Sequence, residues 1–599
     1  MSIVACAGAA SRGGLRLFGF YKSVSLLSFW EPFVAVAMRA RLNIFLVLQI
    51  ALSKETYVNG YRFLTFENSP WVSPGSAHPY SLEYTTTISG TDYNSSFESV
   101  NGKTWPSFHL LIPASETNPN LCKTLLSAFL LNYPPPTLIN FGKRVDRDNR
   151  GKGDYTGKIR GVWDYLEKEE RIADGDIVLV IDGYDVWFQL PPEVMIKRYY
   201  RAISEANKRL KSKYGMTALG GGGRSGRAAR FAETVVFAAG KLCWPNPKED
   251  PACRSIPEST LPEDAWGPWT DKDPEGRLNR PRFLNSGSII GPVADVKAVY
   301  GTAVTKAEDQ ESSAIGDQFV FSEIFGEQEY QREVVRQANR GTSGRLQEWF
   351  AGKLGLALGP KNGSTEINEM IAEEGQRYEF GIGLDYEAAM FQTMTHSHGD
   401  VEYLVYNDTV RLSAVQEEHR VWGVRHVLAL PEDIASLRPP FPVANGFFQG
   451  NSTHRAKPLF PPNTLLDNTS WNGLSLSTNL HVPSVPALLH FNGERSYLQD
   501  WWPRMWYHSH ARTLLQLYIR LPSGATAAQT AGMGGQKWWD MRGGKGGVWT
   551  DKGEWMSWEE ICGGFEEEVF GDGRGSWGED GGNRKVYNSW GKLVSGGDE

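Results

Sequence analysis

The chain of 599 residues is long enough to bury a large core, and it can hold two or three domains or one enlarged domain. Its hydrophobic content of 41% and charged content of 22% are those of an ordinary globular protein, and a net charge of -7 gives no support for a nucleic-acid partner. The five cysteines are too few for a disulfide scaffold, and they lack the paired CxxC spacing of a zinc site.

The N-terminal region, residues 1–53, is predicted to direct the chain into the secretory pathway. The apolar run Leu42–Leu52 follows Arg39 and Arg41 and ends in small residues suited to cleavage. This run is short for a bilayer span, and Glu31 interrupts the apolar stretch before it. We therefore expect a signal peptide or a weak signal anchor, and a secreted or type II membrane-anchored protein of the ER or Golgi lumen.

Residues 54–104 are polar and rich in Ser and Thr, so we expect a stem or linker there. Several N-glycosylation sequons fit passage through the secretory pathway and predict a glycoprotein. The five sequons begin at Asn94, Asn362, Asn407, Asn451 and Asn468.

From residue 105 onward, segments with strand spacing alternate with segments with helix spacing. This alternation predicts an α/β fold in which helices flank both faces of a parallel or mixed sheet. The expected strands are 107–112, 137–141, 177–181, 234–238 and 282–290, and the expected helices are 121–131, 158–171 and 193–210.

Long loop-rich segments interrupt this pattern at 220–227, at 246–280 and over much of 396–485. Loops of this length are usually functional or disordered. The Gly-rich end of the chain, 522–599, is expected to be a tail of low order that carries scattered Trp and acidic residues. Cys243 and Cys253 flank a Pro-rich loop, and they either close it as a disulfide or are two unrelated thiols.

Two acids follow the most apolar of the expected strands. Ile177–Ile181 is apolar on both faces, as in a buried parallel strand, and Gly183 breaks the regularity after it. Asp182 and Asp185 therefore project from the carboxyl end of a strand, where open α/β sheets bind their ligands. Because neighbouring carboxylates repel each other, the pair indicates a divalent cation, which commonly carries a nucleotide diphosphate. Alternatively, the acids only cap the turn before the helix that begins near Pro192.

Further segments bear on these acids, and together they resemble a known family. In order they are Cys243-Trp244-Pro245, Leu284-Asn285-Ser286-Gly287, Asp317-Gln318, Leu384-Asp385 with Phe391-Gln392, and His490-Phe491-Asn492-Gly493. After the Asp-x-x-Asp strand end, this order resembles the glycosyltransferase domain of lysyl hydroxylases and procollagen galactosyltransferases. Gly157-Lys158-Ile159-Arg160 also resembles a segment of that family. The resemblance covers roughly residues 105–500.

The resemblance implies a GT-A fold over residues 105–521, namely a Rossmann-like mixed sheet, flanked by helices and with long loop insertions, that binds a nucleotide sugar and a divalent metal. It implies that Asp182, Asp185 and His490 coordinate the metal. Carboxylate and phosphate oxygens with an added imidazole favour Mn²⁺ over Mg²⁺. The candidate catalytic residues on the sugar or acceptor side are Asn285 and Asp317, and the candidate donor-binding residues are Lys158, Tyr184, Ser286, Gly493 and Arg495.

Simpler structural roles stay open for several of these residues. His490 could be structural, Asn285–Gly287 could be only a turn, and Asp317 could be only a helix N-cap. The chain also departs from the family pattern, because Ser496 stands where the family has a basic residue and Arg495 precedes it. Phosphate contacts at this position are therefore not carried over from the family.

The predicted function is a metal-dependent transfer of sugar from a nucleotide sugar, expected to be a UDP-sugar, to a glycan or protein hydroxyl. The stretch between Gln392 and His490 is far longer than in the family, so a different acceptor is expected. A non-catalytic descendant that binds nucleotide sugars or glycans is the alternative, and retention of both acids and His490 argues against it.

A third interpretation is a metal-dependent phosphohydrolase, but a two-metal centre would need more acids and histidines than these motifs supply. His398-Gly399-Asp400 matches the start of an oxygenase iron site, but it lies inside the transferase region, where a surface turn is the better interpretation.

Overall fold

The structure, a computed structural model, divides into two compact units, Met1–Thr86 and Thr87–Glu599. The predicted signal segment 1–53 lies outside the described residues, as do four of the five sequons, whereas Asn407 is exposed. None of the helices in the described part of the chain combines the length and hydropathy that a membrane span requires. The described residues are 54–58, 61–65, 106–143, 156–218, 227–309, 316–338, 377–419, 427–437, 469–482, 484–520, 546–577, 586–587 and 593–595.

The first unit contains one antiparallel pair of strands, β1 (Lys54–Val58) and β2 (Tyr61–Thr65). Both strands lie in the segment predicted to be a stem or linker. This part of the predicted stem therefore contains two paired strands.

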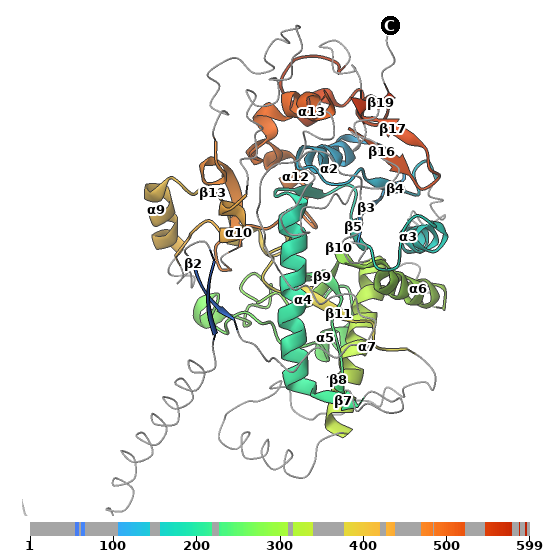
Figure 1. The fold of residues 1–599 in the computed structure, drawn as a ribbon, viewed down its shortest axis with the longest axis vertical. Coiled ribbons are helices and arrows are strands. Elements are labelled where there is room, and N and C mark those ends of the chain that lie inside the picture. Colours follow the sequence, from blue (N-terminus) through green and yellow to red (C-terminus); the bar gives the residue numbers. More distant parts are fainter. Residues whose placement is uncertain are drawn as a thin grey trace, which may run out of the picture. The chain divides into compact units, whose positions relative to one another are not determined.

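The second unit is built on an eight-stranded sheet (Figure 1), which confirms the predicted mixed α/β architecture. Neighbouring strands are parallel, except that β10 is antiparallel to both its neighbours and β17 is antiparallel to β16. All five predicted strands are present within two residues of their expected bounds. The order is β11 (Ile382–Asp385), β9 (Val235–Gly240), β10 (Phe283–Pro292), β5 (Ile177–Ile181), β3 (Phe108–Pro113), β4 (Thr137–Ile139), β16 (Gly547–Thr550) and β17 (Trp555–Ser557).

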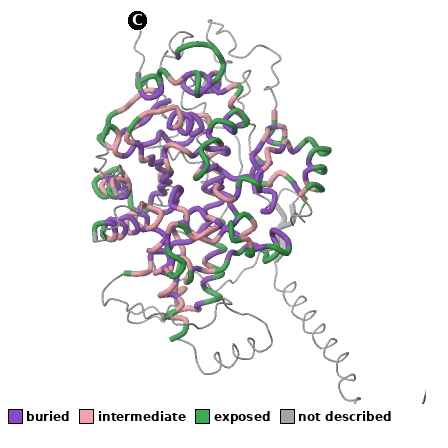
Figure 2. The backbone as a smooth tube through the Cα atoms, turned by 180° about the vertical axis from the view of Figure 1, so that it is seen from behind, coloured by how far each residue is buried: buried purple, intermediate pink, exposed green. Residues whose placement is uncertain are grey.

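Helices cover both faces of this sheet, because the side chains of its central strands are apolar on both sides. In β5, Ile177, Leu179 and Ile181 join one hydrophobic cluster, and Val178 and Val180 join the other. Figure 2 shows the buried interior of this unit and the exposed outer turns of its helices. The first cluster includes α2 (Pro119–Leu130) and α4 (Pro192–Tyr214), and the second includes α3 (Thr156–Lys168), α6 (Val293–Asp309) and α7 (Asp317–Ala338).

Local sequence signals set the ends of the two helices on the first face. The side chain of Asn118 caps α2 by accepting a hydrogen bond from the Leu121 amide at 2.9 Å. Helix α4 has Pro192 as its first residue, where the missing N–H costs nothing, and it ends at Gly215 with φ of 74°.

A smaller sheet lies beside the end of β5 and contains β6 (Val186–Phe188), β15 (Leu488–His490) and β12 (Phe391–Thr393). The central strand β15 is antiparallel to β6 and parallel to β12. Because β6 begins directly after Asp185, residues 182–185 connect the two sheets.

Much of the segment 396–485 was expected to be loop-rich, and its described residues also contain regular elements. Long-range pairing, which local propensity does not reveal, joins β13 to β14 in antiparallel register. The elements here are β13 (Val401–Val405), α9 (Thr409–His419), α10 (Glu432–Ala435) and β14 (Ser475–Asn479).

The prediction of a tail of low order from residue 522 is wrong for residues 546–577. Strand β16 adds to the edge of β4 in the main sheet, and the amide of Trp549 donates to the Pro136 carbonyl at 2.9 Å. A disulfide joins Cys122 of α2 to Cys562, the last residue of α14 (Trp558–Cys562). The expected domain boundary at 521 therefore does not separate this segment from the sheet.

A second disulfide joins Cys243 to Cys253, so the first of the two alternatives for these cysteines is present. The remaining elements are short. They are β7 (Met216–Ala218), β8 (Arg227–Ala229), α5 (Pro251–Arg254), α12 (Tyr497–Asp500), α13 (Ala511–Arg520), α15 (Glu566–Phe570), β18 (Val586–Tyr587), β19 (Leu593–Ser595) and 3-10 turns at Gly267–Trp269, His398–Asp400, Trp471–Gly473, Trp502–Arg504 and His508–His510.

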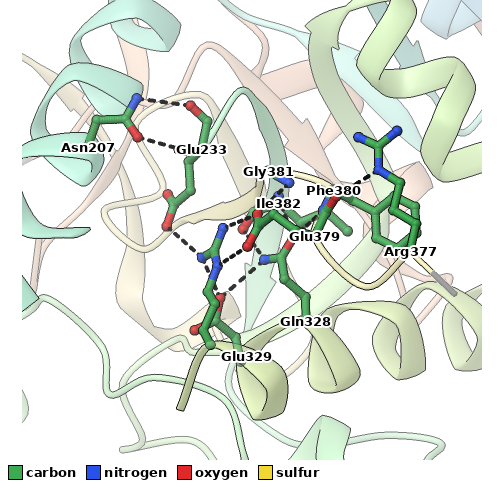
Figure 3. Close-up of polar contacts among 10 residues, drawn as sticks. Asn207, Glu233, Gln328, Glu329, Arg377, Glu379, Phe380, Gly381 and Ile382 are labelled. Carbon is green, nitrogen blue, oxygen red and sulfur yellow. Dashed lines mark hydrogen bonds and ion pairs between the residues drawn. The ribbon is translucent and has the colours of Figure 1, made fainter. Parts of the chain in front are cut away.

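A buried polar network ties α7 to the amino end of β11 (Figure 3). The carboxylates of Glu329 and Glu379 accept hydrogen bonds from the Arg332 guanidinium at 2.6–2.7 Å, and that of Glu233 lies 3.7 Å from it. The amide oxygen of Gln328 accepts from the backbone of Phe380 and Ile382. This network lies at the opposite end of β11 from its terminal residue Asp385.

Candidate metal centre

The backbone at the end of β5 is fixed on two sides. The amide of Asp182 donates to the Gly287 carbonyl at 3.0 Å, and the amide of Phe491 donates to the Asp185 carbonyl at 2.7 Å. Gly183 cannot carry a side chain without a shift, because a Cβ there would lie 2.8 Å from the Pro113 carbonyl oxygen. The two acids are therefore held between β10 and β15.

His490, the last residue of β15, faces both acids. Its Nε2 atom lies 3.5 Å from Asp182 Oδ2 and 3.6 Å from Asp185 Oδ1. Ligand atoms of these three residues all lie within 4.8 Å of one another, and in the described part of the chain no other group of three such side chains converges in this way. The structure thus brings together the three predicted metal ligands, although His490 follows the two acids by more than 300 residues in the sequence.

The two carboxylates and the imidazole shift one another's pKa values. Burial raises the pKa of the Asp185 carboxyl, and neighbouring Asp182 raises it further. Burial alone would raise the pKa of Asp182, but Lys158 and His490 lower it below its usual range. Burial would lower the pKa of His490, yet the two carboxylates raise it. Each carboxylate is stabilised by positive charge nearby. Two carboxylates beside an imidazole are also a donor set that fits a divalent cation.

Lys158 of α3 supplies one positive charge beside the acids. Its Nζ atom is bonded to Asp182 Oδ1, and it donates to Asp317 Oδ2 at 2.6 Å. Burial lowers the pKa of this ammonium, but the two carboxylates raise it well above its ordinary value, so Lys158 stays charged. Asp317 is the first residue of α7 and contacts Lys158 rather than His490.

Asn285 contacts His490, a role that the sequence did not suggest. Its Oδ1 atom lies 3.1 Å from Nδ1 of His490 and also accepts from the Gly287 amide at 3.3 Å. Its expected place on the sugar or acceptor side stays a prediction. A register shift between Asn285 and Ile289, where β10 pairs with β9, bulges the backbone at this point. Asn285 therefore contacts the Nδ1 side of the imidazole, whereas the Nε2 side faces the two acids.

Gly287 leaves room for the imidazole. A Cβ atom at Gly287 would lie 2.7 Å from both nitrogens of His490, closer than real side chains approach. Ser286 lies on the same bulge, and its amide donates to the Gln318 side chain at 2.9 Å. Gln318 also donates to the Leu284 carbonyl, so this side chain supports the bulge, a role that sequence reasoning did not assign.

The remaining predicted donor-binding residues differ in their contacts and exposure. The hydroxyl of Tyr184 accepts from the amides of Ser115 and Glu116 at 3.0 and 3.2 Å, so it is engaged by the loop after β3. Gly493 has φ of 94°, which favours glycine, and it lies against Thr395. Arg495 is exposed, and its charge lowers the pKa of Asp185.

A cavity of about 390 Å³ is lined by residues from three separate segments of the chain. Two of its lining residues, His396 and His398, follow β12, in which Thr393 is paired with His490, and Leu242 follows the end of β9. The remaining lining residues are Glu275 and Arg277.

The iron-site pattern around His398 does not converge on a metal-binding group. The His398 ring packs on Tyr497, with ring centroids 5.3 Å apart. Asp400 is buried elsewhere, where it accepts from the Trp266 indole at 2.9 Å and pairs with Lys241 at 2.6 Å. The better interpretation, a local turn, agrees with the 3-10 turn at His398–Asp400.

A scan against protein-family models finds no match for this chain. A search of curated proteins also finds no significant match.

Proposed function

We propose that this protein is a metal-dependent glycosyltransferase of the GT-A fold, which transfers a sugar from a UDP-sugar to a hydroxyl of a glycan or protein acceptor. The observation that carries this proposal is the convergence of Asp182, Asp185 and His490 at the carboxyl end of β5. Open α/β sheets bind nucleotides at this edge. The order of motifs along the chain, similar to that of lysyl hydroxylase glycosyltransferase domains, supports the same assignment.

The donor set favours Mn²⁺, which would neutralise the diphosphate and stabilise the departing nucleotide. Lys158 and Arg495, whose charges both act on Asp185, would add positive charge where charge develops on the leaving group. Gly493, which has no side chain and is exposed, permits close approach of its backbone to the diphosphate. Tyr184, whose hydroxyl is already engaged, offers its ring rather than its hydroxyl to the uracil base.

Ser286 and Asp317 are proposed to line the sugar side of the centre, and the cavity beside His396 is proposed to receive part of the acceptor. A location in the ER or Golgi lumen is supported by the two disulfides, Cys122–Cys562 and Cys243–Cys253, because disulfides persist in oxidising compartments.

The test is nucleotide release by the purified protein with a panel of UDP- and GDP-sugars, with Mn²⁺ or with chelator. We expect release from a UDP-sugar that requires Mn²⁺ and is lost in Asp185→Asn. Binding of UDP with Mn²⁺ but no release from any donor would favour the non-catalytic binding protein. Release that survives the Asp185→Asn substitution would show that the site is elsewhere.

A further inference from the structure

Lys158 is bonded to one of the two carboxylates that the metal would bind. Its ammonium is bonded to Asp182 Oδ1 and also contacts Asp317 at 2.6 Å. Asp182 is one of the three residues whose ligand atoms converge. A divalent cation that binds Asp182 must therefore share this carboxylate with a positive side chain, and the two cations repel each other.

The position of Lys158 in its helix indicates that the two acids hold it there. It lies in the first turn of α3, which contains no acidic residue. A positive charge at a helix N-terminus is disfavoured by the helix dipole. The contacts with Asp182 and Asp317 thus outweigh an unfavourable local field.

A nearby hydroxyl indicates that the charged group is not complete as it stands. Tyr300 of α6 is fully buried, and its hydroxyl has no hydrogen-bond partner among the described residues. The charged side chains that act on Tyr300 are Lys158, Asp317 and Asp182, of which Lys158 has the largest effect. Buried hydroxyls are nearly always satisfied, so an unpartnered one beside these charged side chains indicates a site whose partners change.

We propose that Lys158 is a displaceable counter-ion, which neutralises Asp182 when no donor is bound, weakens binding of a divalent cation alone, and turns to the donor diphosphate when cation and nucleotide bind together. The last part rests on the proposed function, whereas the competition for Asp182 does not. The consequence is that the cation binds weakly without nucleotide and tightly with it.

The test is to titrate Mn²⁺ alone, and then UDP in the presence of Mn²⁺, into the wild-type protein and Lys158→Gln, following free Mn²⁺ by electron paramagnetic resonance. We expect Lys158→Gln to bind Mn²⁺ alone about tenfold more tightly, and UDP with Mn²⁺ about tenfold more weakly. A residue that only stabilises the site would move both affinities in the same direction. Unchanged or weaker binding of Mn²⁺ alone by Lys158→Gln would overturn the proposal.

Two further variants keep this test interpretable. Lys297→Gln removes the same charge from α6, where Lys297 pairs with Glu167 and Asp174, and it should leave both affinities unchanged. Lys158→Arg retains the charge, so it should keep the weak binding of Mn²⁺ alone, and tight binding there would also overturn the proposal. Measuring nucleotide release separates the counter-ion proposal from the proposed transferase function. If Lys158→Gln binds Mn²⁺ more tightly but the wild type shows no turnover, only the transferase function is overturned.

Discussion

At the scale of single residues, Asn285 determines which nitrogen of His490 faces the acids. Its amide oxygen lies 3.1 Å from Nδ1, so Nδ1 carries a proton and Nε2 is directed toward Asp182 and Asp185. Residues that orient an imidazole in this way are as important for metal binding as many ligands. The imidazole is thus pre-positioned as a ligand before any cation binds.

The substitution Asn285→Ala should lower the affinity for Mn²⁺ by about 10- to 100-fold, because the imidazole loses its orienting acceptor. Isothermal titration with Mn²⁺ and UDP measures this change. Asn207→Ala, which removes hydrogen bonds to the backbone of Glu233 at the opposite end of the sheet, is the matched control and should leave the affinity unchanged. Equal affinities of Asn285→Ala and the wild type would contradict the orienting role.

Gly287→Ala should displace the imidazole and reduce Mn²⁺ affinity by at least about 100-fold, with a loss of stability of roughly 1–3 kcal/mol from overpacking. Gly175→Ala is the control, because a Cβ at Gly175 meets nothing within 4 Å. Metal titration and thermal unfolding of both variants check the prediction. Wild-type metal affinity in Gly287→Ala would show that His490 is not a ligand.

The grouping of the three predicted ligands could be anticipated from the sequence. Two of them directly follow an apolar strand, and the third belongs to the last of a series of motifs that occur in a fixed order along the chain. The role of Asn285 could not be predicted in the same way. By itself, the segment Asn285-Ser286-Gly287 predicts only a turn. The bulge in β10 is what directs the Asn285 amide toward His490, which is 205 residues away in the sequence. Such an orientation depends on strand register, which a local motif does not specify.

At the scale of elements, strand β16 is the largest departure from the sequence prediction. Its four residues lie in a Gly-rich region whose composition is typical of disorder. They are ordered because they pair with the backbone of β4 at the edge of the sheet. In addition, the following helix α14 is attached to α2 by a disulfide. The contacts that order this segment join residues hundreds of positions apart, so its composition alone was misleading.

Removing the disulfide by Cys122→Ser together with Cys562→Ser should lower the stability by about 2–5 kcal/mol. The pair Cys243→Ser and Cys253→Ser should cost less, because that disulfide closes a loop of sequence separation 10 rather than 440. Thermal unfolding of the two double variants compares them. A larger loss for the short loop would contradict the role of Cys562 in attaching the C-terminal segment.

The Arg332 network predicts a pH dependence of stability that is independent of the metal centre. Burial raises the pKa of Glu233 from 4.5 to about 7, and Arg332 only partly opposes this shift. The folded protein therefore holds a proton that the unfolded chain releases above about pH 4.5, so this contribution to stability is present at low pH and is lost as the pH rises through about 7.

Glu233→Gln should remove this dependence, because the amide does not titrate. The unfolding temperature of the wild type should fall more between about pH 5 and about pH 8 than that of Glu233→Gln. An equal fall in both proteins would mean that Glu233 does not hold the proton.

At the scale of the whole molecule, the alternation of strands and helices could be predicted because each element carries its own periodicity. The five predicted strands all occur in one sheet. The pairing of β13 with β14, and the addition of β16 and β17 to the sheet edge, could not be predicted because the partners are far apart in the sequence. Thus the local sequence pattern predicts the strands and helices that carry the candidate metal centre, and long-range pairing adds further elements to them.

The most direct test of the central claim is anomalous diffraction at the manganese edge from crystals grown with MnCl₂ and UDP. We expect one strong anomalous peak in contact with Asp182, Asp185 and His490, with the UDP diphosphate beside it. A peak that contacts other residues, or bound UDP with no peak at these three side chains, would contradict the account.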